Sequence, residues 1–223
     1  MNGANLTTLE IEPQSKARFS VIWMHGLGAD AHDFEPIVRE LKLPEEAGIR
    51  FVFPNAPVRP VTINGGMAMR AWYDILSMDL PRLEDEPGVN ESETAIRALI
   101  EIEGRRGIAP DRVLLAGFSQ GGAMALHTAL RYPDRLAGIL ALSCYVPLAG
   151  AFKQQRNANN LDLPIFLAHG KQDGVIPINY GRAAADRLVS LGYRPEWHEY
   201  NMAHEVCLNE IGDIAAWLKR VVE

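Results

Sequence analysis

The stretch from residue 113 to residue 126 constrains the fold more than any other part of this chain. It opens with a run of apolar residues of strand length, continues through a Gly-x-Ser-x-Gly pattern centred on Ser119, and ends in a run of small residues. The two glycines lack side chains, so a strand and the helix after it can approach each other closely around a sharp turn. The stretch therefore predicts a strand, a turn that carries Ser119 at its tip, and a helix.

Apolar runs of strand length alternate with helical patterns along the rest of the chain. A near-continuous apolar run is typical of a strand that is buried on both faces, as in a parallel sheet. Apolar runs or β-prone segments lie at 6–11, 19–24, 49–53, 112–117, 137–143, 164–168 and 195–200. Helical patterns lie at 34–41, from residue 90 onward, after Ser119, at 179–191 and after His204. The alternation predicts an α/β protein with a mostly parallel, twisted sheet and helices on both faces.

The segment from residue 55 to residue 88 is predicted to be irregular and to contain short elements of its own. It carries many large apolar side chains, which a solvated linker lacks. We expect Asp33 to cap the helix before it, and Asn90 with Glu93 to cap the helix after it. No repeat of fixed period and no linker marks a domain boundary, so residues 1–223 are predicted to form a single domain.

Composition argues against several classes of function. The net charge of −6 argues against a nucleic-acid-binding protein, which presents a basic surface. Two cysteines, Cys144 and Cys207, cannot make a disulfide framework, and we interpret them as reduced thiols. The first residues have neither the basic segment nor the apolar core of a signal peptide, and no stretch approaches the ~18 apolar residues of a membrane span. We therefore expect a cytoplasmic protein without stable membrane insertion.

Candidate catalytic residues follow three of the predicted strands. Ligands of parallel sheets bind beyond the carboxyl ends of the strands, and Ser119, Asp173 and His204 all follow strands in that chain order. A serine hydroxyl needs a base to act as a nucleophile, and histidine can take and return that proton near neutral pH. A carboxylate on the other ring nitrogen fixes the tautomer of the histidine. The three residues therefore predict a nucleophile, its base and its acid.

Other histidines are alternatives to His204. His25 and His169 also follow strands, and we assign His25 a mainly structural role at the start of a glycine-rich loop. The remaining histidines lie inside a strand, inside a helix or near a helix start: His198, His127 and His32. Only His204 lies in a loop after the last predicted strand.

The acids also leave an alternative open. Asp162 precedes its strand and so lies at the wrong end of the sheet, and Asp186 lies in a helix. Asp173 follows the right strand, but by itself it is equally well explained as a turn residue before Gly174. Its position in one series with Ser119 and His204 favours the catalytic interpretation.

An oxyanion that forms during acyl transfer needs fixed hydrogen-bond donors. The backbone N–H of Gln120 lies at a predicted helix N-terminus, where it can bind an anion. The backbone N–H of Leu27, in the loop after the first core strand, is the natural second donor. We therefore predict an oxyanion hole made by Leu27 and Gln120.

Five segments of the chain match one combination of motifs. They are His25-Gly26-Leu27-Gly28, Trp72-Tyr73-Asp74, Gly117-Phe118-Ser119-Gln120-Gly121-Gly122, Gly170-Lys171-Gln172-Asp173 and His204. Together they resemble the small carboxylesterase and acyl-protein thioesterase family of α/β hydrolases, from about Pro13 to the C-terminus. One departure stands out, because Cys144 and Tyr145 follow Ser143 where family members often have a glycine. These two side chains either narrow the pocket or pack in the core.

The resemblance implies an α/β-hydrolase fold without a large lid domain. It implies the roles already assigned to Ser119, Asp173 and His204 and to the N–H groups of Leu27 and Gln120, and it implies no metal and no bound cofactor. It also suggests that the segment from Val61 to Met78 folds over an acyl groove beside Ser119. The substrate-binding candidates in that segment are Val61, Met67, Met69 and Trp72. The alternative is that these side chains form a satellite core.

The predicted function is that of a serine carboxylesterase, which hydrolyses small acyl esters of short to medium chain length through an acyl-enzyme. A chain of 223 residues leaves little room for a large lid domain, which disfavours a long-chain lipase. Acyl-protein thioesterase or lysophospholipase activity at the same site is the alternative, and a non-catalytic α/β binding protein is a third hypothesis. Dimers occur among similar proteins, so the resemblance also allows for a homodimer. The sequence leaves the physiological substrate open.

Overall fold

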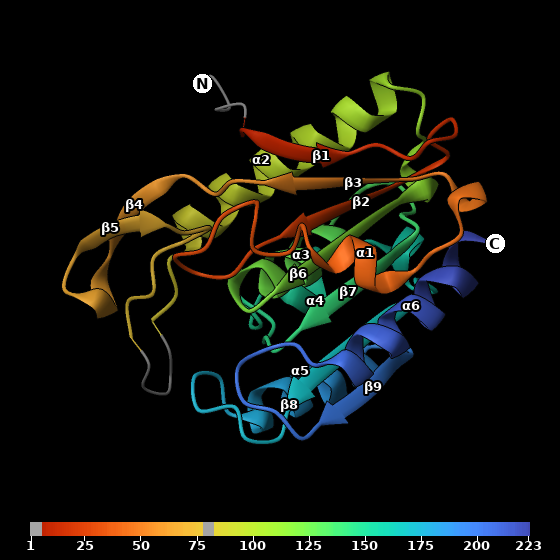
Figure 1. Ribbon diagram of the computed structural model, residues 1–223. Helices are drawn as coiled ribbons and strands as arrows, with labels where there is room; N and C mark the ends of the chain where they lie inside the picture. The colour runs from red at the N-terminus through yellow and green to blue at the C-terminus, as the bar shows by residue number, and fades with distance from the viewer. Residues whose placement is uncertain (1–5, 78–82) are drawn as a thin grey trace.

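A seven-stranded sheet forms the centre of the computed structural model, which describes residues 6–77 and 83–223 (Figure 1). Its strands are β1 (Thr8–Ile11), β2 (Phe19–Met24), β3 (Ile49–Pro54), β6 (Val113–Phe118), β7 (Gly138–Leu142), β8 (Ile165–Gly170) and β9 (Pro195–Tyr200). Their order in the sheet is β1-β3-β2-β6-β7-β8-β9. β1 pairs with β3 in the antiparallel direction, and the other pairs are parallel. The predicted mostly parallel sheet is therefore confirmed, with β1 as the antiparallel edge strand.

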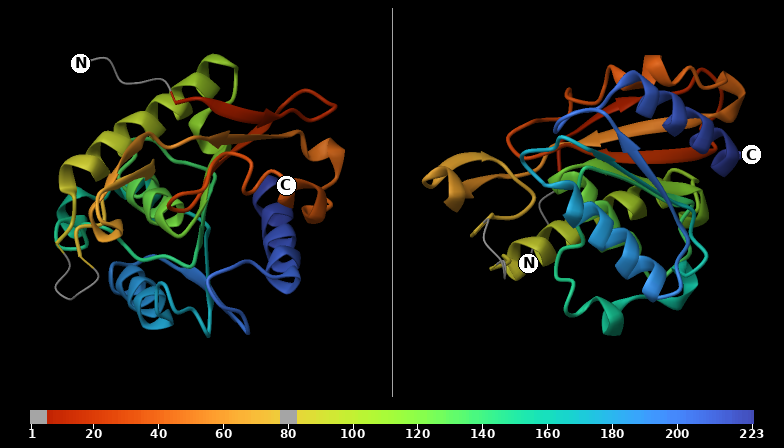
Figure 2. Two further views of the ribbon diagram at one scale, coloured as in Figure 1. Left: turned by 60° about the vertical axis from the view of Figure 1, so that its left-hand side comes forward. Right: turned by 90° about the horizontal axis from the view of Figure 1, so that it is seen from below.

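Helices cover both faces of this sheet (Figure 2). One face packs against α2 (Glu86–Arg105), α3 (Gln120–Ala129), the short α4 (Phe152–Gln155) and α5 (Ile178–Ser190). The other face packs against α1 (Ile37–Leu41) and α6 (Leu208–Val222). None of the helices within residues 6–77 and 83–223 is long and apolar enough to cross a membrane.

The central strand β2 shows why the core strands are apolar at nearly every position. Ile22 and Met24 belong to the core on the α3 side of the sheet, whereas Val21 and Trp23 belong to the core on the α6 side. All four side chains are at most 1% exposed. Successive side chains of a strand point to opposite faces, so a strand covered on both faces needs apolar residues without alternation.

Two helices begin at other residues than the sequence predicts. α2 begins at Glu86, and the Asp85 side chain caps it by accepting a hydrogen bond from the Gly88 N–H at 3.0 Å. The prediction that Asn90 opens this helix is therefore wrong. A proline in the first turn of a helix costs no hydrogen bond, so the helix can start before Asn90 and include Pro87 in its first turn. α1 begins only at Ile37, so Asp33 does not cap it.

The segment between β3 and α2 contains a hairpin that projects from the body of the molecule (Figure 1). Its strands are β4 (Val58–Val61) and β5 (Met67–Arg70), which pair in the antiparallel direction. A 3-10 turn at Thr62–Asn64 joins them, followed by two glycines with positive φ. The expectation of short elements within residues 55–88 is confirmed. Met78, the end of the predicted groove segment, lies outside the described residues.

Candidate active site

Ser119 occupies a strained turn between β6 and α3. Its φ of 55° and ψ of −119° lie where a residue with a side chain is rarely found. A Cβ atom on Gly117 would lie 2.2 Å from the Gly121 backbone, and one on Gly121 would lie 2.2 Å from the Met24 carbonyl oxygen. Both positions therefore require glycine, because the strand, the turn and the neighbouring strand β2 are in direct backbone contact.

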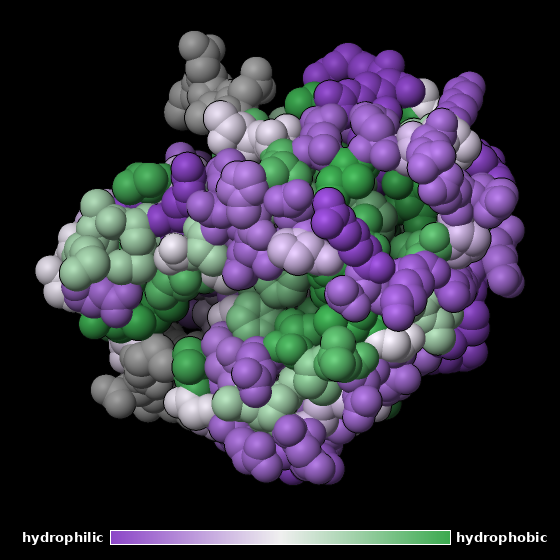
Figure 3. Space-filling view, in the orientation of Figure 1, coloured by the Kyte–Doolittle hydropathy of each residue, from purple (hydrophilic) through white to green (hydrophobic). Residues whose placement is uncertain are grey.

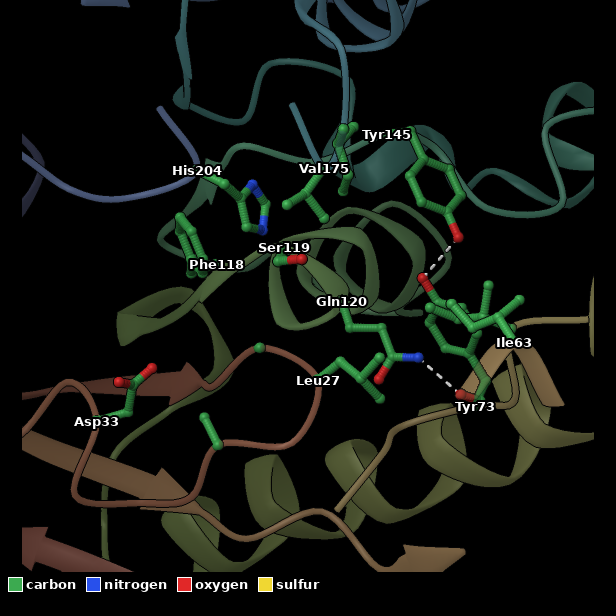
Figure 4. A pocket seen from close by; sticks show the side chains of 14 residues that line it. Leu27, Asp33, Ile63, Tyr73, Phe118, Ser119, Gln120, Tyr145, Val175 and His204 are labelled. Carbon is green, nitrogen blue, oxygen red and sulfur yellow. Dashed lines mark hydrogen bonds between the residues drawn. The ribbon is translucent and has the colours of Figure 1, made fainter. Parts of the chain in front are cut away.

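The turn carries Ser119 into a pocket of about 290 Å³ (Figure 4). The walls come from the β4–β5 hairpin and the segment after it, from the β6–α3 turn, and from the loops after β2, β7, β8 and β9. These are the carboxyl ends of the strands, as expected for a parallel sheet. The lining is mainly apolar, and two of its residues, Ile63 and Val175, are 39% and 52% exposed at its rim. Figure 3 shows apolar surface over the β4–β5 hairpin and over the centre of the face that is turned to the viewer.

Asp173 holds His204 in this pocket. The Nδ1 atom of His204 lies 2.7 Å from Oδ2 of Asp173, whose side chain is fully buried. The other oxygen, Oδ1, accepts hydrogen bonds from the backbone N–H groups of Val175 and Ile176 at 2.9 and 2.8 Å. Asp173 therefore both stabilises the turn at Gly174 and binds His204, because each interaction uses a different oxygen of its carboxylate. The His204 ring also packs on Phe118, with ring centroids 4.6 Å apart.

His204 lines the pocket with Ser119, and the alternative histidines lie elsewhere. His169 is fully buried, and its Nε2 lies 2.7 Å from the Ile176 carbonyl oxygen and 3.4 Å from Asp173. Burial lowers the pKa of His169, so it holds the Asp173 turn as a neutral donor. His127 is buried in α3, where its Nε2 lies 3.0 Å from a carboxylate oxygen of Glu93.

The loop after β2 is held by the side chain of His25. The Nε2 atom of His25 accepts a hydrogen bond from the Ala56 N–H at 3.0 Å, so its Nδ1 carries the proton and donates to the Gly26 carbonyl at 2.7 Å. Burial lowers the pKa of His25 and favours this neutral form. Because the Gly26 carbonyl and the Leu27 N–H belong to one planar peptide, this hydrogen bond also fixes the direction of that N–H.

Leu27 and Gln120 line the pocket beside Ser119, as predicted for two oxyanion donors. Gln120 is the first residue of α3, where a backbone N–H has no acceptor within its own helix. The Leu27 N–H has no hydrogen-bond partner within the described residues, whereas the next N–H, of Gly28, donates to the Arg70 carbonyl at 2.9 Å. The N–H groups of Leu27 and Gln120 therefore lie beside Ser119 and can donate hydrogen bonds to an anion there.

The Gln120 side chain has a function that the sequence did not reveal. Its Oε1 accepts a hydrogen bond from the Trp72 N–H at 2.9 Å, and its Nε2 donates to the Tyr73 carbonyl at 2.6 Å. This amide therefore pairs with the extended backbone after β5 and fixes it beside the serine turn. The sequence shows a glutamine directly after the motif serine, but it gives no sign of the hydrogen-bond partner Trp72, which lies 48 residues away in the chain.

The four substrate-binding candidates do not line the pocket, and this prediction is corrected. Val61 and Trp72 are fully buried, and the Trp72 indole N–H donates to the His25 carbonyl at 2.9 Å. Met67 is 64% exposed on the hairpin, and Met69 packs beside Gly28. The same segment lines the pocket through other residues, namely Ile63, Tyr73 and Ile75. The apolar character of the segment identified it correctly, but the turns within it decide which side chains point inward.

Cys144 and Tyr145 separate into the two roles that the sequence left open. Cys144 is 4% exposed and packs against α3 beside Gly122, and burial raises the pKa of its thiol. Tyr145 lines the pocket, and its hydroxyl lies 2.9 Å from the hydroxyl of Tyr73. Tyr145 therefore narrows the pocket, whereas Cys144 is a core residue.

The doubly covered parallel sheet and the serine at a strained strand-to-helix turn, beside a histidine bound to a buried aspartate, define an α/β hydrolase of the serine type. A sequence model of the phospholipase/carboxylesterase family matches residues 7–222, and the chain belongs to that family. The resemblance found in the sequence is thereby confirmed, as is the α/β-hydrolase fold without a large lid domain.

Relatives with known names cover nearly the whole chain. Acyl-protein thioesterase 1 of Mycosarcoma maydis is 37% identical over 97% of this chain and 98% of that protein. Acyl-protein thioesterase 1 of Yarrowia lipolytica is 35% identical over 92% of both chains. The crystal structure of Arabidopsis thaliana SOBER1 superposes with a TM-score of 0.87 at 33% identity, over 93% of this chain and 100% of that chain. Zea mays acyl-protein thioesterase 2 has a TM-score of 0.85 at 25% identity, over 97% and 99%.

Proposed function

We propose that the protein hydrolyses carboxylic esters and thioesters of short to medium acyl chains through a covalent acyl-enzyme on Ser119. The observation that carries the proposal is the arrangement of Ser119 and His204 in one apolar pocket, with His204 bound to buried Asp173 at 2.7 Å. The pocket supplies a nucleophile and a base, and its walls supply apolar contact for an acyl chain.

Acylation begins when the Ser119 hydroxyl attacks the carbonyl carbon of the substrate. His204 takes the serine proton on Nε2, and Asp173 stabilises the resulting imidazolium through Nδ1–H. The carbonyl oxygen becomes an oxyanion that accepts hydrogen bonds from the N–H groups of Leu27 and Gln120. The bond to the leaving group then breaks, and His204 returns its proton to the departing alcohol or thiol.

Deacylation repeats these steps with water as the nucleophile. His204 takes a proton from a water molecule while that water attacks the acyl carbon on Ser119. The same two N–H groups stabilise the second oxyanion, and the proton then returns to the Ser119 oxygen as the carboxylic acid leaves. One site therefore serves both halves of the reaction.

The volume of the pocket supports the choice of acyl chain. Sites for drug-sized ligands occupy about 300–1,000 Å³. At about 290 Å³, this pocket lies at the lower end of that range and suits short and medium acyl groups better than long ones.

Thioester hydrolysis is the candidate that the relatives favour. The two fungal relatives at 35% and 37% identity are named acyl-protein thioesterases. The proposed chemistry does not distinguish ester from thioester, because both present the same carbonyl group to Ser119. Lysophospholipase activity remains the further alternative for this site.

The test compares matched substrates that differ in one atom. We expect butyryl ester and butyryl thioester substrates both to be hydrolysed, and the Ser119→Ala variant to lose about 10⁴-fold or more in kcat and all labelling by a fluorophosphonate. Asp111→Ala, on the other end of the sheet, is the matched control and retains labelling. Labelling that persists in the Ser119→Ala variant would falsify the assignment of the nucleophile. A thioester preference above a hundredfold would favour the thioesterase over the carboxylesterase.

A further inference from the structure

Two tyrosine side chains meet across the end of the pocket that lies away from His204. In Figure 4, His204 is on one side of Ser119, and Tyr73 and Tyr145 are on the other. The two hydroxyl oxygens lie 2.9 Å apart, within hydrogen-bond distance. Tyr73 comes from the segment after β5, and Tyr145 comes from the loop after β7, so the pair joins two walls of the pocket.

A second, much smaller cavity lies behind these tyrosines. Its volume is about 10 Å³, and Tyr73, Ile75 and Tyr145 belong to its lining as well as to the lining of the Ser119 pocket. Its other described walls include Asp74, Val89 and Leu83, and Leu83 is 70% exposed. The two phenol rings, together with Ile75, therefore form the wall between the Ser119 pocket and the small cavity.

Tyr73 is held firmly in place. Tyr73 is 3% exposed, and its carbonyl accepts the hydrogen bond from the Gln120 side chain at 2.6 Å. Tyr145 is half-buried, its backbone neighbours Cys144 and Val146 are buried, and its hydroxyl is within hydrogen-bond distance of that of Tyr73. A partition built from fixed backbone and two hydrogen-bonded rings cannot yield to a growing acyl chain without a loss of packing.

Two further hydrogen bonds hold segments around the small cavity. The Asp74 N–H donates to Asp85 Oδ2 at 2.9 Å, and the Leu148 N–H donates to Glu84 Oε1 at 2.8 Å. These hydrogen bonds tie the segment after β5 and the loop after β7 to the start of α2. The segments that carry the two tyrosines are therefore held against the residues before and at the start of α2, and removal of a phenol ring would open space into the small cavity.

We infer that the Tyr73–Tyr145 pair is the end wall of the acyl pocket and sets the upper limit of acyl chain length. Acyl groups that end at the phenol rings fit between them and Ser119, whereas longer chains meet the wall. Tyr145 is then a specificity-determining residue, and its replacement by a small residue joins the two cavities and adds the volume of the lost ring to the space for a long chain. This inference rests on the proposed function, because it assigns the substrate range of the same site.

The experiment measures kcat/KM for p-nitrophenyl esters from acetate to palmitate in the wild-type protein and in three variants. We expect the ratio of kcat/KM for laurate to that for acetate to rise at least tenfold in Tyr145→Ala, which removes the ring. Tyr145→Phe keeps the ring and loses only the hydroxyl, so its ratio should stay within about threefold of the wild-type ratio. Tyr145→Leu removes less of the side chain and is expected to give an intermediate ratio. This variant tests the same inference if the alanine variant does not fold.

The outcomes distinguish this inference from the proposed function. A wild-type protein that neither hydrolyses the acetate ester nor reacts with a fluorophosphonate would refute the proposed function itself. If the wild-type protein is active and the folded Tyr145→Ala and Tyr145→Leu variants keep its chain-length profile, the end wall is refuted alone. A wild-type preference for palmitate over butyrate would also overturn the end wall. Fluorophosphonate labelling and a thermal melt establish that each variant is folded.

Discussion

The carboxylate of Asp173 divides its two oxygens between structure and chemistry. Oδ1 binds the backbone N–H groups of Val175 and Ile176, and Oδ2 binds His204. An asparagine at this position keeps an oxygen for the backbone but presents an NH₂ group to the histidine. Replacement of Asp173 by asparagine should therefore lower the proposed activity while leaving the fold intact.

We predict that Asp173→Asn lowers kcat by about 10³–10⁴-fold, because the amide forces the wrong tautomer on His204. The melting temperature should change by only a few degrees, since Oδ1 still accepts the two backbone hydrogen bonds. Steady-state kinetics and thermal denaturation measure the two effects. Asp162→Asn, an exposed carboxylate at the other end of the strands, is the control and should behave like the wild type. Near-normal kcat in Asp173→Asn would mean that another acid supports His204.

At the scale of single elements, the start of α2 joins a helix cap to the wall of the small cavity. Asp85 Oδ1 accepts from the Gly88 N–H at 3.0 Å, and Oδ2 accepts from the Asp74 N–H at 2.9 Å. One side chain therefore ends the irregular segment after β5 and begins the helix that covers this side of the sheet.

Removal of this cap should weaken the whole fold. We predict that Asp85→Ala lowers the free energy of unfolding by about 1–3 kcal/mol, because a helix cap and a second backbone hydrogen bond are both lost. Asp85→Asn retains one carbonyl oxygen for the cap and should lose less than half as much. Urea denaturation followed by circular dichroism compares the two. Equal loss in both variants would mean that the charge, rather than the cap, is what matters.

The elements of the sheet and the catalytic candidates were predictable from the sequence, whereas the apolar side chains that line the pocket from the segment after β3 were not. A strand buried on both faces needs apolar residues at nearly every position, so β2 appears in the sequence with its observed bounds. The glycines around Ser119 are equally local signals, since each is required by backbone contact within the turn or with β2. The walls depend instead on contacts between distant segments, such as that between Gln120 and Trp72. Such a pairing leaves no periodic pattern in either segment.

The whole molecule contains buried titratable groups that act on stability in opposite directions. Glu210 is fully buried near the start of α6, and burial raises its pKa to about 8. An acid with a raised pKa stabilises the fold at low pH, and that stabilisation is lost as the pH rises from about 4.5 to 8. His25, His127 and His169 have lowered pKa values because of burial, so they reduce stability as the pH falls below 6.5. Glu210 therefore favours the folded state at acidic pH, whereas the three histidines favour it at neutral and alkaline pH.

We predict that Glu210→Gln removes the alkaline part of this profile. The unfolded chain releases the Glu210 proton near pH 4.5 while the folded protein keeps it to about pH 8. The free energy of unfolding of the wild type should therefore fall by about 2–4 kcal/mol more than that of the variant between pH 5 and pH 8. Urea denaturation at a series of pH values measures the difference. Parallel profiles for the two proteins would show that Glu210 is ionised in the folded state throughout.

The hydrogen bonds of His25 have a consequence for how the protein meets its substrate. Its ring ties the Gly26–Leu27 peptide to the segment after β3, and the Trp72 indole holds the His25 carbonyl from the other side. The entropy of ordering this loop is therefore lost when the chain folds, before any ligand arrives. Because the loop is already ordered, it need not rearrange when substrate binds. The backbone around Leu27 should therefore keep its position when an acyl group is attached to Ser119.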